Sequence, residues 1–406
     1  MTQSVDTPRK NGIGWRTMGP RDPEEAHRAA TPLELFFDLC FVVAVAQAGS
    51  SLHHALVEGH TADAVSAFPF VFFAIWWAWM NFTWFASAYD NDDIGYRIGV
   101  LVQILGALIL AAGVPRAFDD RDFAVTTVGY SVMRVALVSL WIRAAIQHRE
   151  GRPSAMRYAI GVAACQLGWM GLLLLPDSIR LMGWAVLVPL ELLVPVWAER
   201  HGVTPWHPGH IVERYGLFTI IVLGESVLAA SLAIQSSLDA GESLADLASV
   251  AAGGLLIVFS MWWIYFDLPT DIVVGSARAD FADRRWGAFV WGYGHLVVFA
   301  SAAAVGAGLA AAVDQAADHG VLSATGAALA VSVPVSVYLV SVWVLHARYK
   351  APGFVRAGSV PIAVAVILAA SFITESVLVT GCVLVLLIVV STARRARGGA
   401  VTALSR

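Results

Sequence analysis

The sequence predicts an all-α integral membrane protein of about 12 transmembrane helices, arranged as two tandem six-helix repeats in parallel orientation. Of the 406 residues, 58% are hydrophobic and only 14% are charged, whereas soluble domains carry about 25% charged residues. Apolar runs of about 20 residues, the length that crosses a bilayer as a helix, recur along the chain. Arg and Lys concentrate in alternate connecting segments, as expected for a multi-pass protein.

An N-terminal tail, residues 1–30, is rich in Pro and Gly and contains acidic residues. It is too long and too acidic for a signal peptide, so we expect a disordered cytoplasmic segment. The first predicted repeat, 31–200, contains the apolar segments 33–56, 63–87, 94–114, 122–146, 155–175 and 178–198. The second, 201–396, contains 211–236, 244–268, 285–312, 322–347, 358–374 and 376–393. A short cytoplasmic tail follows at 397–406.

The last two segments are separated only by Thr374–Ser376. They are therefore predicted either as two separate spans or as one long span with a re-entrant piece. The positive charges favour an even number of spans. With the N-terminus inside, 22 of the 26 Lys and Arg residues fall in cytoplasmic segments, and only Arg116, Arg121 and Arg180 fall outside. Both termini are therefore predicted to be cytoplasmic.

The two halves of the chain share four short stretches in the same order, which predicts the tandem repeat. These pairs start at Leu33 and Val212, at Trp76 and Trp262, at Leu137 and Leu339, and at Asp177 and Glu375. Each half holds an even number of segments, so the repeats keep the same orientation, as in some transporter families.

Ionisable side chains inside the apolar segments are candidates for function, because charge opposes membrane insertion. Arg134 and Glu191 are predicted to form a buried ion pair, since a buried guanidinium needs a carboxylate. The repeat alignment places Ser336 and Val389 at the matching positions, so both charges are absent together from the second half. The pair either holds the first repeat together or provides an arginine for gating or anion binding.

Glu225 and His295 are predicted to lie near the middle of the membrane. Glu225 follows Glu213 by twelve residues, or about 18 Å of helix, and histidine titrates in the physiological range. The hypothesis is that Glu225 exchanges protons and that His295 lies close to it. The structural alternative for each residue is that its side chain only forms a hydrogen bond between two helices.

A second group of ionisable residues is predicted at the cytoplasmic ends of the helices. Thr31 and Glu34 have the spacing of a capping box, which gives Glu34 a structural explanation. Asp38 lies one turn deeper and needs a partner or a water-filled vestibule. The predicted cytoplasmic ring consists of Glu34, Asp38, His210, Glu213, Arg214 and Asp267. The predicted proton-relay or substrate path joins Glu34, Asp38, His210, Glu213, Glu225, Asp267 and His295.

Other kinds of site are not indicated. The sequence contains no P-loop, GxSxG or HExxH motif, and Cys40, Cys165 and Cys382 have no metal-ligand spacing. The histidines of "HHALVEGH", His53 to His60, are expected to be solvated surface. No cofactor or metal is expected, and a net charge of −4 does not indicate a nucleic acid partner.

Two stretches, "ATPLELFFDLCFVVAVAQ" and "ERYGLFTIIVLGESVLA", supported by "WWIYFD", resemble the low temperature requirement A (LtrA) family of bacterial multi-pass membrane proteins. The resemblance spans about Thr31 to Arg395 and implies a location in the bacterial inner (plasma) membrane. Cys40 stands where the family more often has an aliphatic residue. The family pattern falls on Pro32, Glu34, Phe37, Asp38, Glu213, Arg214, Gly224, Glu225 and Asp267.

The leading functional hypothesis is a proton-linked secondary transporter or permease for a small molecule or ion, surrounded by the lipid bilayer. The first alternative is a membrane-embedded enzyme that acts on a lipid or isoprenoid, with Asp38, Glu225 and His295 as acid–base groups. The second alternative is a non-transporting stress or scaffold protein.

Overall fold

A computed structural model describes residues 14–23, 25, 28–268, 274–275, 286–318, 320–347 and 358–404. Twelve α-helices are placed within these ranges, which contain no β-strand. The tail predicted at residues 1–30 lies in large part outside the described residues.

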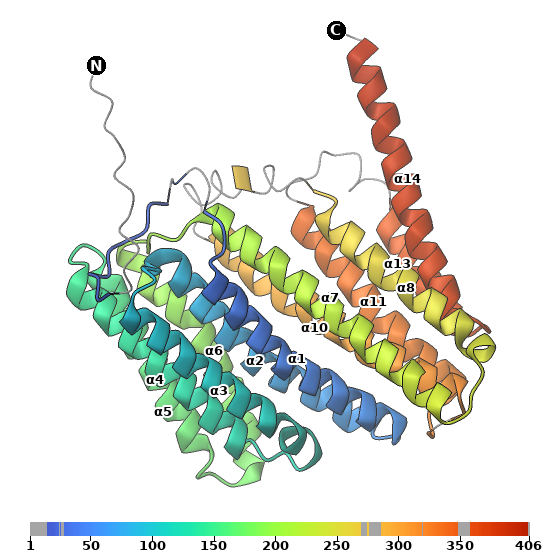
Figure 1. Cartoon of the computed structure of the whole chain (residues 1–406), viewed down its shortest axis with the longest axis horizontal. Coiled ribbons are helices and arrows are strands. Elements are labelled where there is room, and N and C mark those ends of the chain that lie inside the picture. Colours follow the sequence, from blue (N-terminus) through green and yellow to red (C-terminus); the bar gives the residue numbers. More distant parts are fainter. Residues whose placement is uncertain are drawn as a thin grey trace. The chain divides into compact units, whose positions relative to one another are not determined.

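Each of the twelve predicted apolar segments coincides with one helix (Figure 1). The first six are α1 (Pro32–Val57), α2 (Thr61–Tyr89), α3 (Ile94–Asp119), α4 (Ala124–Gln147), α5 (Arg152–Leu172) and α6 (Asp177–Ala198). A short 3-10 helix (Glu199–His201) precedes α7 (Pro208–Asp239), α8 (Leu244–Phe266), α10 (Trp286–Ala316), α11 (Ala324–His346), α13 (Ser359–Ala370) and α14 (Ser376–Leu404). The prediction of an all-α chain with about 12 helices is confirmed over the described residues.

Ten of these helices are long and apolar enough to cross a membrane. The other two are α5, which carries Arg152, Arg157 and Gln166, and α13, which has only 12 residues. A full span needs about 20 residues, and the chain turns at residues 371–375 before α14 begins. The shortness of α13 favours the alternative in which the last two segments are not two full spans.

The described residues form two compact units. Unit 1 contains the described part of Met1–Glu25 together with Trp84–Gly106 and Ser131–His207. Unit 2 contains the described parts of Ala26–Thr83, Ala107–Tyr130 and Pro208–Arg406. Helix α1 and most of α2 therefore pack with helices of the second predicted repeat. The duplication itself stays a prediction.

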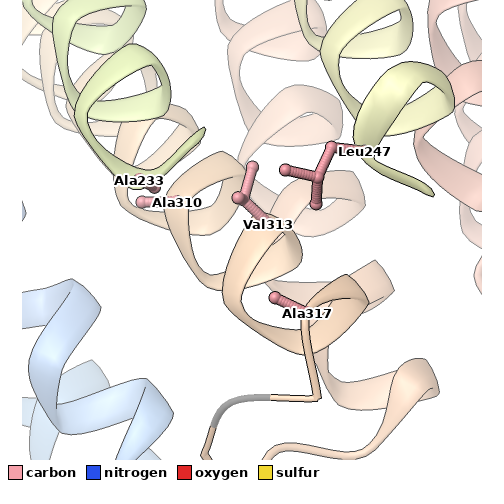
Figure 2. Packing of buried hydrophobic residues seen from close by; sticks show 5 residues of the cluster. All are labelled: Ala233, Leu247, Ala310, Val313 and Ala317. Atoms are coloured by element: carbon pink, nitrogen blue, oxygen red, sulfur yellow. The ribbon is translucent and has the colours of Figure 1, made fainter. Parts of the chain in front are cut away.

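Helix α10 is central to unit 2, where it contacts α1, α7, α8 and α11 (Figure 1). Its buried face is rich in alanine between residues 302 and 312, and small residues allow neighbouring helices to approach closely. Figure 2 shows one such contact, in which Ala233 of α7 and Leu247 of α8 meet Ala310, Val313 and Ala317. This packing holds α7 against α10 on one side of the candidate site.

In unit 1, Asp93 lies between α2 and α3 and anchors the start of α3. Its carboxylate accepts hydrogen bonds from the backbone N–H groups of Tyr96 (2.8 Å) and Arg16 (3.0 Å), and from the Arg143 guanidinium (2.9 Å). Burial alone would raise the pKa of Asp93, but the bonds from Arg143, Arg16 and Tyr96 lower this pKa to about 2. The ionised carboxylate therefore stabilises the folded state.

The depressed pKa of Asp93 predicts a loss of stability in acid. The stabilisation is present above the ordinary aspartate pKa of 3.8, and it disappears as the pH falls from about 4 toward 2, by at most about 2.4 kcal/mol. Asparagine also caps helices well but does not titrate. The thermal midpoint of the purified protein should therefore fall less steeply between pH 5 and pH 3 in Asp93→Asn than in the wild type. Equal slopes would contradict this role.

Candidate functional site

The N-terminus of α1 is fixed by the predicted capping box, which the structure confirms. The backbone N–H of Glu34 donates to Thr31 Oγ1 (3.3 Å), and the backbone N–H of Thr31 donates to Glu34 Oε2 (2.8 Å). Pro32 occupies the first position of the helix, where its missing N–H is harmless. Capping uses Glu34 Oε2, which also lies 3.2 Å from His210 of α7, while Glu34 Oε1 lies 3.2 Å from Arg214.

Five charged or titratable residues meet at the N-terminal ends of α1 and α7, and we call them the buried ion cluster: Arg28, Glu34, Asp38, His210 and Arg214. Arg214 joins the two acids, because its Nη1 lies 3.2 Å from Glu34 Oε1 and its Nη2 and Nε donate to Asp38 at 2.6 and 3.0 Å. Glu34 Oε1 also lies 3.2 Å from His210 Nε2 and 3.8 Å from Arg28 Nη2.

The buried ion cluster is balanced in charge and shielded from solvent. The side chains of Glu34, Asp38, His210 and Arg214 are 0% exposed. Two carboxylates face two guanidinium groups, so the formal charge is zero when His210 is neutral. Removing one partner of a buried pair typically costs about 3–5 kcal/mol, because the other charge stays behind. The cluster therefore locks α1 to α7 at this end.

Four aromatic residues form a layer next to the buried ion cluster: Trp79, Tyr215, Phe218 and Phe299. Trp79 stacks on Phe218 with ring centroids 4.3 Å apart, and both meet the edge of Phe299. The indole N–H of Trp79 also donates to Asp38 Oδ1 at 2.6 Å. This aromatic layer is fully buried and is bonded directly to the cluster.

A cavity of about 580 Å³ lies between α1, α7 and α10, toward the C-terminal ends of these helices. Gly306 of α10 lets α7 come close, since a Cβ at this position would lie 2.8 Å from Ser226 Cα. Ser226 Oγ donates to the carbonyl oxygen of Ala302 at 2.9 Å. The cavity is lined by Val45, Ala46, Gln47, Gly49, Ser50, His53, His54, Val57, Glu225, Ser226, Leu228, Ala229, Leu232, Ala233, Ser236, Ala303, Gly306, Ala307, Ala310 and Asp314.

Glu225 and Asp314 are the two carboxylates that line this cavity in the described part of the chain. Asp314 Oδ2 lies 2.6 Å from His53 Nε2, whereas Glu225 is half-buried and has no hydrogen bond or ion pair with the residues that the structure describes. Arg214 precedes Glu225 by eleven residues, or about 16 Å of helix. Tyr215 and Phe218 of the aromatic layer lie between these two levels on α7, so the layer separates the buried ion cluster from the level of Glu225 along this helix.

His295 lies apart from Glu225, and the prediction that they are close is wrong. His295 Nε2 bonds Tyr265 Oη (3.0 Å), its Nδ1 bonds the Trp291 carbonyl oxygen (2.7 Å), and its ring packs on Tyr215. Tyr215 precedes Glu225 by ten residues, or about 15 Å along α7. Asp38, Glu225 and His295 therefore do not converge on one acid–base centre.

Two other members of the predicted cytoplasmic ring lie outside the buried ion cluster. Glu213 Oε1 accepts a hydrogen bond from the backbone N–H of Ala30 (3.3 Å), so it lies close to the capping box. Asp267 follows α8 and lines a small separate cavity with Trp343 of α11 and Ser391 of α14. The structure brings Glu34, Asp38, His210 and Arg214 together, and it leaves Asp267 elsewhere.

In unit 1, Arg134 of α4 and Glu191 of α6 form the ion pair that the sequence predicts. Arg134 Nη2 lies 3.0 Å from Glu191 Oε2, and both side chains are buried. The indole N–H of Trp169 in α5 donates to the other oxygen of Glu191 at 3.0 Å. The pair thus ties three helices together, while its gating role stays a prediction.

Sequence reasoning missed several residues of the site. Arg28 falls in the segment that was predicted to be disordered, and Trp79 is one tryptophan in a Trp-rich run. His53 was expected to be surface, yet it is partly buried and bonded to Asp314. The only available signal was that Asp314 is an acid two residues beyond the predicted apolar segment 285–312.

Comparisons with known proteins identify a family. The model of the family described as "Bacterial low temperature requirement A protein (LtrA)" matches residues 29–392. A protein of Rhizobium meliloti (strain 1021), described as uncharacterized protein RA0937, is 27% identical over 277 residues. This match covers 65% of each chain, so the chain spans slightly less than two thirds of that relative's length. No solved structure matches.

Proposed function

The chain belongs to the bacterial low temperature requirement A (LtrA) family of membrane proteins, and on that premise we propose that it is a proton-linked secondary transporter or permease. The observation that carries this proposal is the cavity between α1, α7 and α10. The aromatic layer and the buried ion cluster lie nearer the N-terminal end of α7 than the cavity does. A transporter needs such a site, reached from one face of the membrane at a time.

The position of the cavity supports the same proposal. Helices α1 and α7 begin the two predicted repeats, and transporters built from repeats bind substrate where the repeats meet. The buried ion cluster joins these two helices only at their N-terminal ends. Breaking its contacts, with movement of Trp79, would open the cavity toward that end. If the termini are cytoplasmic, as the Arg and Lys distribution favours, the cavity opens to the outside.

Glu225 is the group proposed to carry the proton. Its carboxylate lines the cavity, so a proton or a substrate can reach it from the open end. The enzyme alternative names Asp38, Glu225 and His295 as acid–base groups, and the position of Glu225 in the cavity, away from His295, does not favour one centre built from all three. The scaffold alternative requires neither the cavity nor a titrating residue at position 225. A substitution of Glu225 should therefore impair a transporter and leave a scaffold protein unaffected.

Accessibility of the cavity from both membrane faces is the test. In a cysteine-free background (Cys40→Ala, Cys165→Ala and Cys382→Ala), Ser50→Cys places a thiol on the cavity wall. We expect a membrane-impermeant maleimide to label it from either face, in right-side-out and inside-out vesicles, with the ratio of the two rates depending on pH. Glu225→Gln should remove that pH dependence, because glutamine does not titrate.

Two loop positions serve as controls for this experiment. Glu150→Cys and Glu242→Cys lie between α4 and α5 and between α7 and α8, and each should be labelled from one face only, Glu150→Cys from the cytoplasm. Labelling of Ser50→Cys from a single face at every pH, unchanged by Glu225→Gln, would contradict a transporter and favour the scaffold function.

A further inference from the structure

We propose that the cavity between α1, α7 and α10 binds a monovalent organic cation with an apolar body, whose positive group pairs with the Glu225 carboxylate. This inference rests on the proposed function in taking the cavity as the substrate path, and it goes further by naming the class of substrate. It is carried by the charge, the lining and the size of the cavity.

The charge of the cavity selects against anions. Among the residues that the structure describes, its lining contains the carboxyl groups of Glu225 and Asp314 and no Arg or Lys. Asp314 is already hydrogen-bonded to His53, with Oδ2 and Nε2 2.6 Å apart. Glu225 is therefore the acid available to a ligand. An anionic ligand would place like charge beside Glu225, whereas a cation would neutralise it in surroundings where solvent screens poorly.

The remaining lining suits an apolar ligand body. Its lining includes Val45 and Val57 of α1, Leu228 and Leu232 of α7, and alanines of α10. Its volume of about 580 Å³ falls within the range of about 300–1,000 Å³ that is typical of small-molecule sites. A hydrated metal ion would leave this apolar surface unused, so an organic cation fits better.

A cation and a proton compete for one carboxylate in this arrangement. When the cation pairs with Glu225, the proton leaves the carboxyl group for water. When the cation departs, a proton returns. One positive charge replaces another in each direction, so the exchange leaves the net charge of the cavity unchanged and couples the cation to the proton gradient.

Tetraphenylphosphonium and tetraphenylborate are suitable probes, because they have the same shape and opposite charge. We expect the wild-type protein in nanodiscs to bind radiolabelled tetraphenylphosphonium saturably by equilibrium dialysis, after subtraction of empty nanodiscs. Tetraphenylborate, measured in separate samples, should show no saturable binding. Glu225→Gln should weaken tetraphenylphosphonium binding by about tenfold or more, as expected for the loss of a charge partner.

Further variants control for misfolding. Leu228→Trp should block the probe by filling the cavity while Glu225 stays in place, and Glu150→Gln, which removes an exposed acid of unit 1, should bind as the wild type does. Absence of saturable tetraphenylphosphonium binding, equal affinity in Glu225→Gln, or equally tight binding of tetraphenylborate would each overturn the cation site.

The cysteine labelling and this binding measurement test the transporter and the cation site separately, so either proposal can be rejected without the other. A cavity that is labelled from both faces but does not bind tetraphenylphosphonium keeps the transporter and rejects the organic cation. A cavity that binds tetraphenylphosphonium through Glu225 but is labelled from one face only keeps the cation site and rejects transport.

Discussion

Replacing Arg214 with methionine is expected to remove most of the folded protein. Methionine roughly preserves the length of the side chain but removes the guanidinium that bonds Asp38 through two nitrogens and contacts Glu34 at 3.2 Å. Two buried carboxylates would then face only Arg28, His210 and neutral donors. The expected cost is about 3–5 kcal/mol, a large part of the stability of a typical protein. Size-exclusion chromatography and the thermal midpoint in detergent measure this loss.

A matched control separates burial from charge. Arg97→Met breaks the exposed Arg97–Asp92 pair, whose contact of 2.8 Å is as short as those in the cluster. Exposed ion pairs contribute little to stability, so this variant should behave nearly as the wild type. Similar damage from both substitutions would show that the buried ion cluster is no more important than a surface pair.

A second change should rescue the Arg214 variant in part. Adding Asp38→Asn removes one of the two carboxylates that have lost the Arg214 guanidinium. The asparagine keeps an oxygen that accepts the indole N–H of Trp79. The double variant should therefore be more stable than Arg214→Met alone. If the aromatic layer depends on the cluster, Ser50→Cys in the double variant should also be labelled faster from the face that carries the N-terminal ends of α1 and α7.

Local features of this architecture could be predicted from the sequence. The helices follow from apolar runs of membrane length, and the capping box depends on residues three apart, Thr31 and Glu34. The need of Asp38 and Arg134 for partners follows from the cost of a buried charge. The partner of Asp38, in contrast, lies 176 residues away, and no local pattern names it among the available cations.

The relative depth of two helices could not be predicted in the same way. Both Glu225 and His295 lie about a dozen residues into their apolar segments, which suggested one level in the membrane. Helix α7 begins at Pro208 and α10 at Trp286, so Glu225 lies seventeen residues into its helix and His295 only nine. Packing fixes that offset, because Tyr215 meets His295 and Ser226 meets Ala302. Counting residues from the charged ends of each segment could not reveal the offset between α7 and α10.

The Arg134–Glu191 pair is the second place where a single substitution should have a large effect. Arg134→Ala removes the charge partner that lies 3.0 Å from the buried Glu191 carboxylate, whose other oxygen accepts the indole N–H of Trp169 at 3.0 Å. The cost should again be about 3–5 kcal/mol, seen as a sharp fall in the yield of folded protein.

The double change shows whether the two charges act as partners. Arg134→Ala with Glu191→Val, which takes the residue found at the matching position of the second predicted repeat, should recover much of the lost yield, because no buried charge remains. Valine cannot accept the Trp169 N–H, and an unsatisfied buried donor costs about 1–3 kcal/mol. Arg134→Ala with Glu191→Gln, which keeps an acceptor oxygen for Trp169, should therefore recover more.

If both double variants are as damaged as Arg134→Ala alone, Arg134 and Glu191 are not energetic partners. If they fold well and still pass the two-sided labelling test at Ser50→Cys, the pair has a structural role rather than a role in gating.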